Sequence, residues 1–127
     1  MTKELDFDAI KAAAESHRAD MTRFLRAMIS HPSESCEEGE VVACIKAEME
    51  SLSYDEVKVD GLGNVMGFMG EGDKIIAIDS HIDTVGIGNI ENWDADPYEG
   101  YETERSSTAA AAPTRRVAWL LLPMLPR

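Results

Sequence analysis

Apolar positions recur at spacings of three and four over residues 7–30, and this period predicts one long amphipathic helix. The aspartate at position 6 or 8 can cap its start, and Pro32 lies just beyond its end. For His17, on or beside the apolar stripe, we expect a packing role rather than metal ligation. The stripe consists of Phe7, Ile10, Ala14, His17, Met21, Phe24, Leu25 and Met28.

The helical period returns after a connecting loop over residues 33–39 and predicts a second helix. Ser35 followed by Glu38 fits a capping box at its start. The acidic side chains there suit the positive end of the helix dipole, so we interpret them as a solvated helix start rather than a metal site. They are Glu34, Glu37, Glu38 and Glu40, and the buried stripe is predicted at Val42, Ile45, Met49 and Leu52.

Alternation replaces the helical period after residue 53. It predicts strands over Tyr54–Asp60 and Asn64–Met69, joined by a glycine turn. The unbroken apolar run Ile75–Ile78 then predicts a strand buried on both faces. Two helices followed by three strands are typical of the opening of an α/β domain built on a mixed sheet.

Polar side chains follow this last strand directly, at Ser80, His81 and Asp83. Ligands and catalytic groups gather at the carboxyl ends of strands in helix-covered sheets. In extended chain, residues two apart point the same way, so Asp83 can hold one ring nitrogen of His81 and leave the other for a metal. A strand-end histidine beside a turn-capping aspartate gives the same pattern, so the residues alone leave both interpretations open.

The wider context of this pair resembles a known family. The segment Asp79-Ser-His-Ile-Asp-Thr-Val85, followed by Trp93-Asp-Ala-Asp-Pro-Tyr98, resembles the first metal motif of the zinc aminoacylase/carboxypeptidase family. That family includes acetylornithine deacetylase, succinyl-diaminopimelate desuccinylase and several dipeptidases. The local sequence is most similar to the branch of selenium metabolism-linked hydrolases. The resemblance covers residues 7–104.

The resemblance implies that residues 1–104 are the amino-terminal part of an α/β metallohydrolase catalytic domain. It implies that His81 ligates one of two zinc ions, with cobalt as a replacement metal, and that Asp83 is the catalytic residue that orients its ring. The reaction implied is hydrolysis of the amide bond of an N-acyl amino acid or small peptide. Trp93 and Tyr98 would either form an ordered loop beside the site or cover the end of the sheet.

The family pattern stops abruptly, because the chain has no Asp, Glu or His after Glu104. The bridging aspartate, the general base and the remaining ligands of the family are therefore missing. A synonymous back-translation of residues 106–119, read from its third base, encodes Ile-Tyr-Gly-Arg-Gly-Gly-Thr-Asp-Gln-Ala-Gly-Gly-Met, which resembles the family's second metal motif. We therefore predict a frameshift near residues 104–106, a truncated and inactive chain, and little or no tight zinc binding. A natural disordered tail over residues 105–127 is the alternative.

The charge is divided in the same place. All 24 acidic residues lie in residues 1–104, whereas the charged residues of 105–127 are all arginines. A net charge of −12 argues against nucleic acid or an anionic membrane as a partner. A second hypothesis is a non-catalytic acidic module that binds a partner protein through its apolar tail, Val117–Leu125. Pro123 and Pro126 argue against a helix there.

Cysteine usage and the first residues bear on the compartment. Cys36 and Cys44 match no zinc spacing, and on the second predicted helix they would be too far apart to form a disulfide. We interpret them as reduced thiols of a cytoplasmic protein. The polar, acidic start is no signal peptide, and Val117–Leu125 is too short to span a bilayer as a helix.

Overall fold

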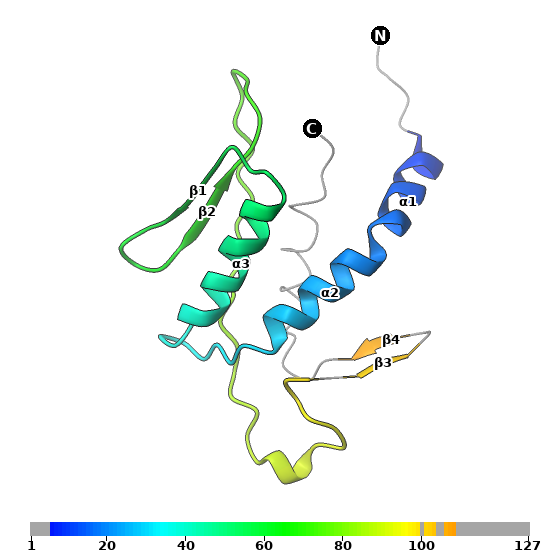
Figure 1. The fold of residues 1–127 in the computed structure, drawn as a ribbon, viewed down its shortest axis with the longest axis vertical. Coiled ribbons are helices and arrows are strands. Elements are labelled where there is room, and N and C mark those ends of the chain that lie inside the picture. Colours follow the sequence, from blue (N-terminus) through cyan, green and yellow to red (C-terminus); the bar gives the residue numbers. More distant parts are fainter. Residues whose placement is uncertain (1–5, 100, 104–105, 109–127) are drawn as a thin grey trace.

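The structure is a computed structural model that describes residues 6–99, 101–103 and 106–108 (Figure 1). These residues form helices, a 3-10 turn and two antiparallel hairpins, β1–β2 and β3–β4, which confirms a mixed α/β fold in this coarse sense. The tail Val117–Leu125 lies outside them. The elements are α1 (Phe7–Ser16), α2 (Arg18–Ile29), α3 (Gly39–Ser51), β1 (Glu56–Val59), β2 (Val65–Phe68), η1 (Ile90–Asn92), β3 (Tyr101–Thr103) and β4 (Ser106–Thr108).

The first predicted helix is two helices, because the chain leaves the α-helical path at His17. The backbone there has φ −92° and ψ 0°, and the His17 N–H donates to the carbonyl of Ala14 at 3.3 Å, which closes α1. Asp6 caps the start of α1, as predicted, by accepting from the Ala9 N–H at 3.0 Å. Every side chain of α1 is exposed, so the apolar stripe is buried only within α2.

The core lies where α2, α3 and the β1–β2 hairpin meet. The prediction of a buried stripe on the second helix is confirmed at Val42, Ile45 and Met49. Arg23 of α2 and Glu48 of α3 form a two-pronged ion pair, with nitrogen–oxygen distances of 2.6 and 3.2 Å, which ties the two helices together at the surface. The buried core residues are Phe24, Met28, Val41, Val42, Ile45, Met49 and Val65.

A glycine allows the hairpin to lie closely on α3. A Cβ atom at Gly67 would come within 2.6 Å of the Tyr54 ring and 2.9 Å of the Met49 sulfur, so only glycine fits this face of β2. At the other end of the hairpin, Gly63 takes a φ of +88°, and the Asp60 carboxylate accepts from the backbone N–H of Asn64 at 2.9 Å. The strands and their turn agree with the prediction to within two residues.

The prediction of a central buried strand at Ile75–Ile78 is wrong for this structure. The segment pairs with no strand among the described residues, and Ile75 and Ile76 are 94% and 88% exposed. A strand of this kind is buried only when strands flank it and helices cover it. Here both described sheets are two-stranded hairpins that pair within themselves, so the mixed sheet does not form.

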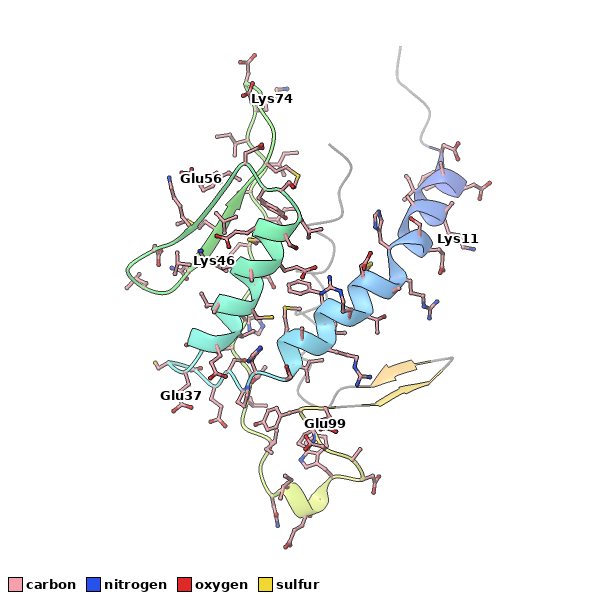
Figure 2. The ribbon with its side chains drawn as sticks, viewed as in Figure 1. Lys11, Glu37, Lys46, Glu56, Lys74 and Glu99 are labelled. Atoms are coloured by element: carbon pink, nitrogen blue, oxygen red, sulfur yellow. The ribbon has the colours of Figure 1, made fainter. Side chains whose placement is uncertain are left out.

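Residues 74–89 instead run as an extended connection from the loop beyond β2 to η1, passing behind α3 in Figure 1. Figure 2 labels Lys74, where this connection begins, near the top of the view, and Glu99, which lies beyond η1, below the helices. Within the described ranges, no helix has the length and apolar character needed to cross a membrane.

Candidate functional site

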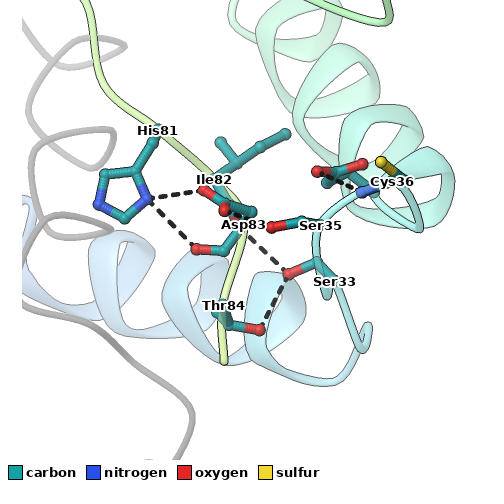
Figure 3. A network of polar contacts seen from close by, with 8 residues as sticks. Ser33, Ser35, Cys36, His81, Ile82, Asp83 and Thr84 are labelled. Carbon is teal, nitrogen blue, oxygen red and sulfur yellow. Dashed lines mark hydrogen bonds and ion pairs between the residues drawn. The ribbon is translucent and has the colours of Figure 1, made fainter. Parts of the chain in front are cut away.

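The two predicted site residues lie where the extended connection meets the loop between α2 and α3 (Figure 3). The Thr84 N–H donates to the Ser33 carbonyl at 2.8 Å, and an isolated parallel bridge pairs Glu34 with Thr84. The Ser33 side chain is fully buried and donates to the Ile82 carbonyl at 3.2 Å. Backbone and side-chain bonds together therefore fix how residues 82–84 lie against the loop.

His81 and Asp83 face one another, as the spacing predicts. The Nδ1 atom of His81 lies 2.9 Å from Oδ1 of Asp83 and 3.3 Å from the Asp83 carbonyl oxygen. A carboxylate and a carbonyl only accept, so Nδ1 carries the hydrogen and donates it. In the neutral ring the other nitrogen, Nε2, then keeps its lone pair, and it lies on the side of the ring away from Asp83 (Figure 3).

The second oxygen of Asp83 is held as well. The Ser35 hydroxyl donates to Oδ2 of Asp83 at 2.8 Å. Hydrogen bonds from Ser35 first and His81 second lower the pKa of Asp83 below its ordinary value, because both stabilise the charged form. The side chains of His81 and Asp83 are 44% and 41% exposed, so solvent and ligands can reach them.

The predicted capping box is wrong, because both of its side chains bond elsewhere. Ser35 donates to Asp83, and Glu38 accepts from the Cys36 N–H at 3.0 Å while making no side-chain cap bond to α3. Because α3 begins only at Gly39, Cys36 lies in the turn before the helix, where its φ is +74°. Only Cys44 is on α3, and both thiols are free.

The described residues provide one ligand position and not a complete metal site. They bring no three His, Cys, Asp or Glu side chains into a group that could hold a metal ion. A catalytic zinc normally takes three protein ligands. Among the described residues, Nε2 of His81 could therefore supply one zinc ligand, and the two further ligands that a catalytic zinc needs do not lie beside it.

The aromatic loop after this segment is ordered by its own bonds. The Trp93 indole N–H donates to the Ile87 carbonyl at 2.9 Å, and Asp96 accepts from the Tyr98 N–H at 2.8 Å. The side chain of Pro97, which lies between Asp96 and Tyr98 in the sequence, is fully buried. The Trp93 side chain therefore ties the loop to its own backbone, and a position of this loop beside the site stays a prediction.

Sequence reasoning missed the two serines that hold the site. A signal was available, because Ser33 and Ser35 are two apart in a stretch after Pro32, and alternate residues of extended chain share a side. The capping-box pattern gave Ser35 a different and purely local explanation.

Comparison with known proteins finds similarity to two curated proteins of Escherichia coli. The chain is 56% identical over 104 residues to YgeY, an uncharacterized protein of Escherichia coli strain K12, and matches the YgeY of strain O157:H7 equally well. The match covers 82% of this chain but only 26% of the relative. The chain therefore spans about a quarter of the length of the curated relatives it matches. No family model and no solved structure matches.

Proposed function

We propose that residues 1–104 are the amino-terminal part of a zinc-dependent amidohydrolase or peptidase in which His81 supplies one metal ligand. The observation that carries the proposal is the bond of 2.9 Å between Nδ1 of His81 and Oδ1 of Asp83. It places the ring hydrogen on Nδ1 and leaves Nε2 free, which is the state that a metal-binding histidine needs. By its resemblance to the family motif, Asp83 would be the catalytic carboxylate, and it would act by orienting the His81 ring.

The substrate class follows from the resemblance of Asp79–Val85 to the zinc aminoacylase/carboxypeptidase motif. We propose an N-acyl amino acid or a small peptide, cleaved at its amide bond, with two zinc ions in the complete site and cobalt as a possible substitute. We also propose a cytoplasmic location, which two free thiols support.

The present chain would be inactive, because the remaining ligands and the general base would come from parts of the protein that it lacks. The lengths support this: the match to YgeY is 104 residues long and covers about a quarter of the relative. Residues 105–127 would then be the out-of-frame segment. For this chain after dialysis we expect well under one zinc per molecule, and two tightly held zinc ions would contradict the proposal.

A chimera tests the proposal directly. Residues 1–104 of this chain would replace the matching segment of YgeY, and zinc content and hydrolysis of a panel of N-acyl amino acids and dipeptides would be measured. We expect the chimera to hold zinc and to hydrolyse at least one class. The variant His81→Ala should lose both, whereas His17→Ala, which changes a histidine between α1 and α2, should keep both. A chimera without zinc, or one indifferent to His81→Ala, would refute the proposal.

A further inference from the structure

We propose that Ser35 is a positioning residue for His81: its hydroxyl fixes the Asp83 carboxylate so that the ring hydrogen stays on Nδ1. This inference rests on the proposed function and names a further residue of the same site. Ser35 does not touch the ring; it acts through Asp83.

The carboxylate needs such a partner. The terminal torsion of an aspartate is broad, so a single bond to His81 leaves the carboxylate plane free to turn. Here each oxygen has its own donor, Nδ1 of His81 at 2.9 Å and Oγ of Ser35 at 2.8 Å. Hydrogen bonds to an ionised acceptor are short and strong, and two of them at opposite oxygens define the plane.

The loop is built to deliver this hydroxyl. Ser33 is locked by its buried side chain and by the bond from the Thr84 N–H to its carbonyl. Ser35 follows two residues later and lies on Asp83, while Cys36 at once turns the chain away with a φ of +74°. The Cys36 N–H is itself held by the Glu38 carboxylate, so the turn is fixed on both sides of Ser35.

Two chemical consequences follow. With Oδ2 held by the Ser35 hydroxyl, the carboxylate plane of Asp83 cannot turn away from the ring. With Oδ1 held against Nδ1, the neutral ring has one tautomer, and Nε2 presents its lone pair. Without the hydroxyl, the carboxylate can turn, and the ring can carry its hydrogen on either nitrogen.

The experiment reads the tautomer of His81 in the metal-free full chain. The chain would be labelled with ¹⁵N and studied over a pH series, and the tautomer would be read in the range where the ring ¹⁵N shifts show the neutral imidazole. Long-range proton–nitrogen correlations distinguish Nδ1–H from Nε2–H, and loss of one signal set in His81→Ala assigns the residue. We expect the Nδ1–H form in the unmodified chain and a mixture of both forms in Ser35→Ala.

Matched variants separate positioning from general damage. Ser35→Thr keeps the hydroxyl and should restore the Nδ1–H form, and Ser35→Cys, a weak donor of similar size, should give an intermediate mixture. Ser51→Ala removes a hydroxyl that donates to the Glu48 carbonyl on α3 at 2.8 Å, and it should change nothing. Because Ser35 is exposed, Ser35→Ala removes no packing, and an unchanged backbone amide spectrum verifies the fold.

The outcomes divide cleanly. An Nδ1–H form that persists in Ser35→Ala, or fails to return in Ser35→Thr, would overturn the role of Ser35 and leave the proposed hydrolase untouched. If the YgeY chimera holds no zinc and is inactive, while Ser35→Ala still changes the tautomer of His81, the proposed hydrolase function is refuted. Ser35 then remains the residue that orients His81. In an active chimera, Ser35→Ala should weaken zinc affinity about 10- to 100-fold, as losses around a metal ligand do.

Discussion

Two isoleucines of this chain have opposite surroundings. Ile45 on α3 is 0% exposed, whereas Ile76 in the extended connection is 88% exposed. Both belong to strongly apolar stretches, and the sequence around each predicts burial. The difference shows that an apolar pattern tells which side chains require cover, while the rest of the chain decides whether cover is supplied.

The cover for Ile45 comes from nearby in the chain. α2 ends shortly before α3, and the β1–β2 hairpin follows it, so three consecutive elements enclose one core. A strand at Ile75–Ile78 requires neighbours on both edges and both faces. Under the proposed function these neighbours belong to the part of the protein that lies beyond residue 104.

The largest effect is expected from restoring the reading frame after Glu104 and continuing the gene in that frame. The completed chain should become a zinc-dependent amide hydrolase, whereas the present chain should show no turnover. His81→Ala should abolish the new activity, and Asp83→Ala should lower activity or metal affinity about 10- to 100-fold. Amide hydrolysis with zinc or cobalt supplied measures each step.

The present chain and the completed chain also test the comparison between the two isoleucines. In the completed chain Ile76 should become covered, so a dye that binds exposed apolar surface should bind less per molecule. If the short chain already turns over substrate and His81→Ala leaves the rate unchanged, the frameshift and the site assignment are both wrong.

The next largest effect concerns stability. Ile45→Ala should lower the free energy of unfolding by about 2–5 kcal/mol, because it leaves a cavity between α2, α3 and β2. Ile76→Ala removes the same atoms from an exposed segment and should stay within about 0.5 kcal/mol of the unmodified chain. Urea unfolding followed by circular dichroism measures both, and equal losses would mean that residue 76 is buried in solution.

A smaller effect is expected in thermal unfolding. The present chain should melt broadly and bind an apolar-surface dye when folded, because a chain with uncovered apolar segments has a small core for its length. The double variant Ile75→Ser and Ile76→Ser should reduce dye binding without lowering the midpoint. A sharp transition in a monomer that binds no dye would contradict this.

The smallest effect concerns the hairpin turn. Hydrogen bonds from the Asn64 side chain, and from the backbone of Asn64 and Leu62, lower the pKa of the Asp60 carboxyl. A lowered native pKa stabilises the fold above the unfolded pKa of about 3.9, and this contribution is lost as the pH falls through the native value. Asn64→Ala should raise the pKa of Asp60 toward its ordinary value, as carboxyl carbon shifts would show, and an unchanged pKa would refute the assignment.

Local signals predicted the local structure well. The cap at Asp6, the stripe of α3 and the glycine turn of the hairpin depend on residues a few positions apart, and each was readable. The break at His17 was missed, because the apolar period continues across it and no glycine or proline marks it. The strand at Ile75–Ile78 failed for the reason already given: its partners are not among the described residues.

The candidate site shows the same division. The contact between the side chains of His81 and Asp83 was predictable, because residues two apart in extended chain point the same way. The roles of the two residues stay predictions. The contact from Ser35 joins residues 48 positions apart. The spacing of Ser33 and Ser35 does not say which residue they face, and the competing capping pattern assigned Ser35 to its own helix.

Helix α1 has a consequence for how the chain moves. It has a capped start and ten residues, yet it buries none of its side chains. An isolated helix of this length is marginal in water, so its amide hydrogens should exchange through local opening with a free energy close to zero. Those of α3, held over the core, should exchange only when most of the molecule opens. A fluorophore or an affinity tag placed on α1 would therefore report on that helix and leave the core undisturbed.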